Sequence, residues 1–127
     1  MIQTRAQKDL KLAYDLVSSV DASAGNDTKS IYQQLCKQFP VMVMQSGLCQ
    51  TLAFHEDKSK KTDARGKAHQ YVLQHSAEVM GVTNAIQTAQ TCNALEYMQH
   101  TRRILSAWVY FKRFAVSALE IEKEVNQ

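Results

Sequence analysis

Apolar residues recur along most of the chain at the spacing of an α-helix. The first such segment runs from about Gln3 to Val20, and its apolar residues at alternating steps of four and three are Ala6, Leu10, Ala13, Val17 and Val20. This spacing places them on one side of a helix and predicts that this side packs against the core. A turn around Gly25 follows. Asn26 or Asp27 then caps a second predicted helix, which ends near Lys37 and offers Ile31, Tyr32 and Leu35 to the core.

The stretch FPVMVMQSGLCQTLAF, residues 39–54, is apolar on nearly every side of a helix. One stripe comprises Val41, Met44, Leu48 and Leu52, and a second comprises Met42, Cys49 and Ala53. A helix that is apolar on most of its circumference is normally buried inside a bundle. Pro40, the only proline, fits the first helical turn, where its missing N–H costs nothing. The pattern therefore predicts a buried central helix from about residue 40 to 56, with Gly47 at its middle allowing another helix to approach closely.

Polar residues follow and predict an exposed loop over residues 57–67, after which a helix resumes near Thr62 or Asp63 and ends at Gly81. Thr83 is a candidate cap for a short helix over residues 84–89. The longest predicted helix runs from about Cys92 to Glu124, and its inner stripe is Tyr97, Thr101, Ile104, Trp108, Phe111, Ala115 and Ala118. No segment alternates like a β-strand. The fold class is therefore all-α, a bundle of five to six helices around the central helix (about 40–56) and the long C-terminal helix, in a single domain spanning residues 1–127.

Composition indicates the cellular compartment and the kinds of partner that are possible, but it does not indicate a function. The chain has 127 residues and a formal net charge of +3, which permits contact with nucleic acid without demanding it. Its three cysteines form no CxxC pair, which favours reduced thiols in the cytoplasm. No apolar run approaches the ~20 residues needed to cross a membrane. The expectation is a cytoplasmic protein with no membrane contact.

Catalytic and metal-binding patterns are weak. No histidine lies four residues from another histidine or from a cysteine, and there is no HExxH motif, so we expect no metal and no other cofactor. Cys49 lies on the apolar central helix, where a buried and inert thiol is expected. His55 and His75 are interpreted as groups on a helix surface or at an interface. No acid–base pair and no phosphate-binding glycine loop is present, so the chain is predicted not to be an enzyme.

Basic residues are more suggestive. Arg5 and Lys8 project away from the apolar face of the first helix, and Lys58 lies in the predicted loop. On the last helix Arg102 and Arg113 lie opposite the inner stripe, about 16 Å apart along the axis. Arg103 is also expected on the outer side, and Lys112 flanks the stripe. Arginine forks suit phosphate oxygens, and a row of them on a helix can follow a nucleic-acid backbone without reading bases.

Two stretches resemble a known family. FPVMVMQSGLCQTLAF is similar to the LP-x-M-I-x-x-x-GL-x-Q-x-LAF signature of the small subunit of type III-B CRISPR (Cmr) RNA-targeting effector complexes. WVYFKRFAVSAL, near the C-terminus, resembles the W-x-x-x-KRFA ending of the same family. Phe39 stands where the family usually has leucine, and Cys49 where it often has glycine. These departures affect local packing rather than the fold.

The resemblance implies a non-catalytic subunit of a ribonucleoprotein that acts in antiviral defence. Members of the family line the groove where target RNA pairs with guide RNA, and they contact backbone subunits, the large subunit and further copies of themselves. Contacts to guide and target RNA would be made to phosphates, independent of sequence. The candidate RNA-binding residues are Arg5, Lys8, Lys58, Arg102, Arg103, Lys112 and Arg113. Among these, only Lys112 and Arg113 fall in a family motif, and the others follow from helix faces.

Two other classes of function stay open. A standalone helical adaptor or homo-oligomer without RNA binding would depend on exposed apolar residues such as Val109 or Leu119 rather than on the arginines. A small enzyme would depend on Cys49 or on a histidine.

Overall fold

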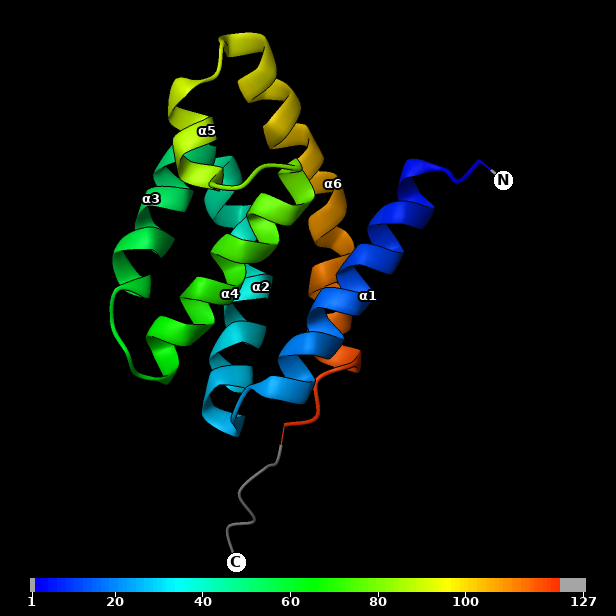
Figure 1. Ribbon diagram of the computed structural model, residues 1–127, viewed down its shortest axis with the longest axis vertical. Helices are drawn as coiled ribbons and strands as arrows, with labels where there is room; N and C mark the ends of the chain where they lie inside the picture. Colours follow the sequence, from blue (N-terminus) through cyan, green and yellow to red (C-terminus); the bar gives the residue numbers. More distant parts are fainter. Residues whose placement is uncertain (1, 122–127) are drawn as a thin grey trace, which may run out of the picture.

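The computed structural model describes residues 2–121, which form a bundle of α-helices (Figure 1). The helices of this part of the chain are α1 (Arg5–Ser23), α2 (Asn26–Ser46), α3 (Leu48–Ser59), α4 (Ala64–Met80), α5 (Ala85–Thr91) and α6 (Ala94–Ser117). No β-strand occurs between residues 2 and 121. The prediction of an all-α fold with five to six helices is confirmed.

The predicted continuous helix over residues 40–56 is wrong, because the chain breaks at Gly47. α2 continues through Pro40 to Ser46, well beyond its predicted end near Lys37, and α3 begins at Leu48. Gly47 has φ 85° and ψ 162°, a conformation that is essentially restricted to glycine. The two apolar stripes of this stretch therefore belong to two helices that face different neighbours.

The break also changes which residues are buried. Leu48 and Leu52, on α3, are fully buried as predicted. Val41 and Met44, on the last turns of α2, are 53% and 75% exposed and do not join them in the core. The stretch that carries the family signature is thus part core and part surface.

The central helix of the bundle is α4. It packs against each of the other five helices of the described chain, and Figure 1 shows it between α3 on one side and α1 and α6 on the other. Its inward residues Ala68, Val72, Ala77, Val79 and Met80 are buried, as the sequence predicts. Histidines and glutamines interrupt the apolar pattern of α4, which is why periodicity assigned the central role to residues 40–56 instead.

Pro40 is accommodated inside α2 by a side chain from α6. A proline within a helix leaves the carbonyl group four residues earlier, here that of Cys36, without its usual N–H donor. The indole N–H of Trp108 donates a hydrogen bond to this oxygen at 3.1 Å. The Trp108 ring also packs against Phe39 and Phe111, with centroids 4.3 Å and 4.5 Å apart. The two motifs that resemble the family therefore meet in the core, where Trp108 of the second motif packs against Phe39 of the first and supplies the hydrogen bond that Pro40 removes.

The outer helices α1 and α6 pack along each other. On α6 the middle of the predicted inner stripe is confirmed, since Ile104, Trp108, Phe111 and Ala115 are fully buried. Its ends, Tyr97, Thr101 and Ala118, are half-buried. The helix ends at Ser117 rather than near Glu124, and the last residues of the predicted helix, 122–124, lie outside the described part of the chain.

The N-terminal turns of α1 differ from the prediction. Thr4 and Gln7 form a capping box that starts the helix, and Ala13, Val17 and Val20 are buried as expected. Ala6 and Leu10, however, are exposed, while Asp9 is buried. Figure 1 shows that the N-terminal end of α1 leans away from α6, and in this part of the helix Asp9 contacts α6 in place of the predicted apolar residues.

The short connections are set by side-chain caps and one glycine. The predicted loop 57–67 is only a turn between Ser59 and Ala64, because the Asp63 carboxylate accepts a hydrogen bond from the Gly66 N–H at 2.9 Å and starts α4. A Cβ atom on Gly66 would lie 1.8 Å from the Lys61 carbonyl oxygen, so the close approach of the turn to the start of α4 requires glycine. Asn84, rather than the predicted Thr83, caps α5.

Candidate nucleic-acid interface

The seven predicted RNA-binding residues lie on three helices. α1 carries Arg5 and Lys8, α3 carries Lys58, and α6 carries Arg102, Arg103, Lys112 and Arg113. α1 and α6 lie side by side, whereas α3 lies across the bundle from them (Figure 1). The structure therefore brings together the helices that hold six of these residues and leaves Lys58 apart.

Arg103 is committed to an ion pair inside the molecule. Its guanidinium group contacts the carboxylate of Asp9, which is 2% exposed, while the Arg103 side chain is 22% exposed. The predicted outward position of Arg103 is thus wrong. Removing one partner of a buried ion pair leaves the other charge uncompensated, so loss of Arg103 would leave Asp9 unpaired between α1 and α6.

Arg102 and Arg113 occupy the outer face of α6. Both side chains are exposed, and neither makes an ion pair or hydrogen bond with any residue between 2 and 121. They lie three helical turns apart, about 16 Å along the axis, on the same side of the helix. Two free guanidinium groups at this separation present positive charge to an extended anion without needing to break an internal contact.

The remaining basic residues of α1 and α6 differ in how freely their charges are exposed near Arg102 and Arg113. Arg5, Lys8 and Lys112 are exposed, and Lys112 projects from the flank of α6 rather than from its outer face. Lys11, also on α1, is paired with Asp15 at 3.8 Å. The strongest part of the candidate interface is therefore the pair of arginines on α6.

Lys58 lies at the end of α3, where its ammonium group is 5.8 Å from the centre of the Phe54 ring. The side chain is half-buried. Desolvation by burial lowers the pKa of His69, and the positive charges of Arg65 and Lys58 lower it further. A cation held over an aromatic ring gains ~0.5–2 kcal/mol from that contact. Lys58 is thus already engaged within the α3–α4 pair.

The outer face of α6 also carries exposed apolar side chains on the same side as Arg102 and Arg113. They are spaced by three, eleven and seven residues and are 50–65% exposed: Leu95, Met98, Val109 and Val116. Together with Arg102 they are spaced by three, four, seven and seven residues, which keeps them on one face of the helix, as in a face that meets another helix. Leu119, the other apolar residue predicted to be exposed, is buried.

The sequence did not identify three buried histidines. His55, His69 and His75 are 1%, 2% and 4% exposed, so the interpretation of His55 and His75 as surface groups is wrong. The Nδ1 atoms of His55 and His69 are 2.8 Å apart, and the Nδ1 atom of His75 is 2.7 Å from the Tyr32 hydroxyl. Spacing could have revealed them, since His55 continues the steps of four and three from Leu48 and Leu52.

Burial governs the acid–base properties of these histidines. Desolvation, aided by the nearby charge of His69, lowers the pKa of His55 to about 3. Desolvation alone lowers the pKa of His75 to about 4. A histidine with so low a pKa stays neutral at physiological pH, and a buried neutral imidazole is suited to packing and hydrogen bonding rather than to proton transfer.

Cys36 and Cys49 are not activated as nucleophiles. Burial raises the pKa of Cys36 to about 12, and desolvation together with the nearby Cys92 raises the pKa of Cys49. The thiolate is the reactive form, so a raised pKa lowers reactivity. Cys49 is half-buried at the start of α3 rather than fully buried as predicted.

Residues 2–121 contain neither a metal-binding cluster nor a membrane-spanning helix. No group of three or more histidine, cysteine, aspartate or glutamate side chains is arranged to hold a metal ion in this range. None of the helices in the same range combines the length and the apolarity that crossing a membrane requires.

Comparison with known proteins places the chain in a family. A family model described as CRISPR-associated protein (Cas_Cmr5) matches residues 5–118, nearly the whole of the described structure. The chain belongs to the Cmr5 family. The CRISPR system Cmr subunit Cmr5 of Thermus thermophilus is 32% identical over 123 residues, which cover 94% of this chain and 99% of the relative. The resemblance inferred from the two sequence motifs is confirmed.

The fold agrees with that of a solved family member. The crystal structure of a CRISPR-associated Cmr5 family protein from Thermus thermophilus aligns with a TM-score of 0.78 at 30% sequence identity. The alignment covers 93% of this chain and all of the other. The helical arrangement described above is therefore a Cmr5 family fold.

Proposed function

We propose that the chain is a small, non-catalytic subunit of a type III-B CRISPR (Cmr) complex in the cytoplasm. The Thermus relative, named as a Cmr subunit, covers almost the whole chain and supports this role. The raised thiol pKa values and the neutral buried histidines favour a contribution by binding rather than by chemistry.

The outer face of α6 contacts the phosphates of guide or target RNA in this proposal. The observation that carries it is the pair Arg102 and Arg113, exposed and free of partners in the described chain. Arg5, Lys8 and Lys112 extend the positive surface around them. Phosphate contacts of this kind weaken steeply as salt concentration rises and do not depend on base sequence. Arg103 and Lys58, both engaged inside the protein, contribute less.

The test is charge reversal at the free arginines within the assembled complex. Arg102→Glu/Arg113→Glu is compared with the matched control Lys60→Glu/Lys61→Glu, which reverses two exposed charges in the α3–α4 turn. Target-RNA affinity is measured between about 50 and 200 mM salt, the range over which phosphate contacts dominate the change. We expect the α6 variant to bind more weakly and to lose about two units of the log–log salt slope, with helicity and melting unchanged. Wild-type affinity and slope in an intact complex would refute the assignment.

The exposed apolar residues on α6 favour a second role, contact with protein. Leu95, Met98, Val109 and Val116 lie on the same side as the arginines. We place the neighbouring Cmr subunits or a further copy of this chain against them. A protein-only adaptor would keep this contact and show no loss of RNA affinity on reversal of Arg102 and Arg113, so the same experiment separates the two functions.

A further inference from the structure

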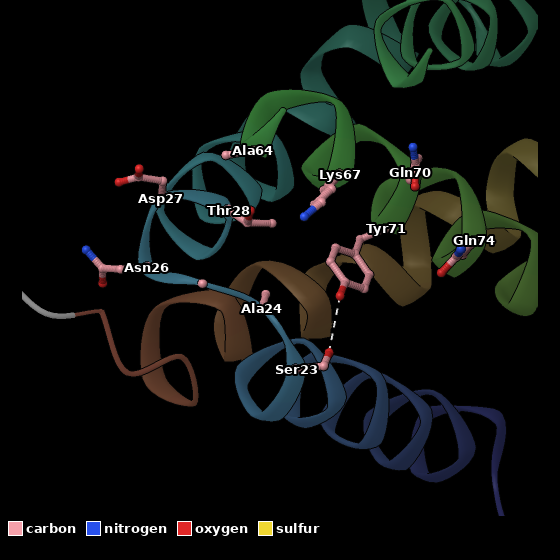
Figure 2. Close-up of a pocket in the computed structure, with 11 residues that line it drawn as sticks. Ser23, Ala24, Asn26, Asp27, Thr28, Ala64, Lys67, Gln70, Tyr71 and Gln74 are labelled. Atoms are coloured by element: carbon pink, nitrogen blue, oxygen red, sulfur yellow. Dashed lines mark hydrogen bonds between the residues drawn. The ribbon is translucent and has the colours of Figure 1, made fainter. Parts of the chain in front are cut away.

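A concave site lies where α1, α2 and α4 meet, and no residue of α6 lines it. We call it the junction pocket; it is lined by residues 23–28 and by Ala64, Lys67, Gln70, Tyr71 and Gln74 of α4. Its volume is about 620 Å³, within the range of small-molecule sites. Figure 2 shows Lys67 and Thr28 on one wall and the Ser23–Tyr71 pair on another. The pocket is therefore separate from the proposed RNA contact on α6.

One end of the junction pocket is the N-terminus of α2. Gly25 is the N-cap residue and supplies no side-chain hydrogen bond to the first turn. The first turn of a helix presents backbone N–H groups that have no acceptor within the helix, and its end carries partial positive charge. Phosphates bind at such ends when the surrounding side chains allow it.

Two side chains point to an anion at this helix end. Thr28 is only 5% exposed and its hydroxyl makes no hydrogen bond with any residue in the range 2–121, although it lines the pocket. Lys67 likewise has no ion-pair or hydrogen-bond partner in that range, and Figure 2 shows its ammonium group directed toward Thr28. Thr28 is nearly buried, and a polar side chain at that depth normally has a hydrogen-bond partner, whereas Lys67 is exposed and free to approach a ligand. An anion in the pocket would supply an acceptor to both.

The opposite end of the junction pocket suits an aromatic base. The Tyr71 hydroxyl is 3.2 Å from the Ser23 hydroxyl, and its ring is braced edge-on by Tyr32, with centroids 6.2 Å apart. Tyr71 is half-buried, so part of its ring remains open to the pocket. Gln74, one turn further along α4, offers both an amide donor and a carbonyl acceptor. Stacking on an aromatic ring next to such an amide is how proteins hold single bases.

We propose that the junction pocket binds a nucleoside monophosphate unit. The phosphate lies at the N-terminus of α2 between Thr28 and Lys67, and the base lies against Tyr71 and Gln74. Asp27 also lines the pocket, but Figure 2 shows its carboxylate directed away from Lys67. The unit comes either from a free nucleotide or from an unstacked residue of an RNA strand, and only the second source rests on the proposed function.

Calorimetric titration of the full chain with uridine 5′-monophosphate, adenosine 5′-monophosphate, inorganic phosphate and a short oligouridylate tests the proposal. We expect the nucleotides to bind more tightly than phosphate, because only they reach Tyr71. Lys67→Met and Thr28→Val should each weaken nucleotide binding by about tenfold or more, the effect of losing one hydrogen bond to a charged group. Lys60→Met, which removes an exposed lysine outside the pocket, is the matched control and should bind as the wild type does.

The probes separate the two sources. An oligouridylate that binds more tightly than the mononucleotide and competes with it assigns the pocket to an RNA strand, whereas a preference for the free mononucleotide assigns it to a small molecule. The proposal is overturned if no nucleotide binds, or if Lys67→Met and Thr28→Val bind as tightly as the wild type. Because Arg102 and Arg113 are intact in these variants, failure here is distinct from failure of the α6 interface.

Discussion

Several polar residues in this bundle are buried and paired in ways that cannot be predicted from their neighbours in the sequence. His55 and His75 stay neutral because the fold removes them from water, and each keeps one hydrogen-bonding contact through Nδ1. Asp9 is buried as an ion and is compensated by Arg103. In each case the partner comes from another helix, so a residue far away in the sequence decides the state of the group.

The buried histidines predict a loss of stability in mild acid. In the unfolded chain a histidine binds a proton near pH 6.5, whereas the folded protein binds it only near pH 3 at His55 and pH 4 at His75. Below pH 6.5 the unfolded state therefore holds protons that the folded state lacks, and the free energy of unfolding falls as pH falls. Each histidine contributes a slope of up to ~1.4 kcal/mol per pH unit in this window.

Urea denaturation between pH 7.5 and 5 measures this slope. His55→Leu removes one of the titrating groups and should make the dependence on pH shallower, even if the variant is less stable at pH 7.5. A free energy of unfolding that stays constant from pH 7.5 to pH 5 would show that these imidazoles are accessible to water.

At the scale of the helices, periodicity predicted where most of them lie but not how the longest apolar stretch divides. The steps of four and three correctly placed Ala13 and Val17 on α1 and Trp108 and Phe111 on α6 inside the core. They failed for residues 39–54, because an apolar pattern on all sides looks the same for one buried helix as for two helices packed in different directions. A glycine in a helical pattern is compatible with either arrangement, so the positive φ of Gly47 cannot be read from the residue type alone.

The positions of the candidate RNA-binding residues were also predicted only in part from the sequence. Helix faces correctly placed Arg102 and Arg113 in solvent, because the wheel position depends only on their own helix. Arg103 could not be placed this way, since its pairing with Asp9 depends on how α1 crosses α6. The junction pocket joins residues from α1, α2 and α4, so no single periodic pattern contains it.

The break between α2 and α3 predicts that Gly47 cannot be replaced. Gly47→Ala forces a side chain into a conformation that costs ~1–3 kcal/mol, and its Cβ would lie 3.4 Å from the Tyr97 hydroxyl. That hydroxyl accepts a hydrogen bond from the Cys49 N–H at 3.0 Å and caps the first turn of α3. We expect a lower free energy of unfolding in urea denaturation.

Gly25→Ala is the matched control for this substitution. Gly25 has φ −76°, and a Cβ there would meet nothing within 4 Å. Alanine stiffens the unfolded chain but is a poorer N-cap residue, and these opposing effects should keep the change below ~1 kcal/mol. Equal stability of Gly47→Ala and the wild type would mean that the α2–α3 break does not need a left-handed residue.

At the scale of the whole molecule, the outer face of α6 is left uncovered by the rest of the described chain. The inner sides of α1, α2, α3 and α6 are covered by the central helix α4 and by each other. The outer face of α6 has no neighbour in the described chain and mixes arginines with apolar residues. A subunit that lies between RNA and protein needs both kinds of side chain on one surface, because phosphates require cations and stable subunit contacts bury apolar area.

This mixed surface predicts that assembly and RNA binding respond to different substitutions. Val109→Asp places a charge at the middle of the apolar residues on α6, where Val109 is 59% exposed, so it should leave the isolated chain folded. Burying that carboxylate against a partner would be unfavourable, and we expect at least about tenfold weaker association with the other Cmr subunits. Met44→Asp, at the 75% exposed end of α2, introduces the same charge away from α6 and should assemble normally. Association is measured by co-purification and by sedimentation of the reconstituted complex. If Val109→Asp assembles normally and Met44→Asp does not, the subunit contact lies at the end of α2 rather than on α6.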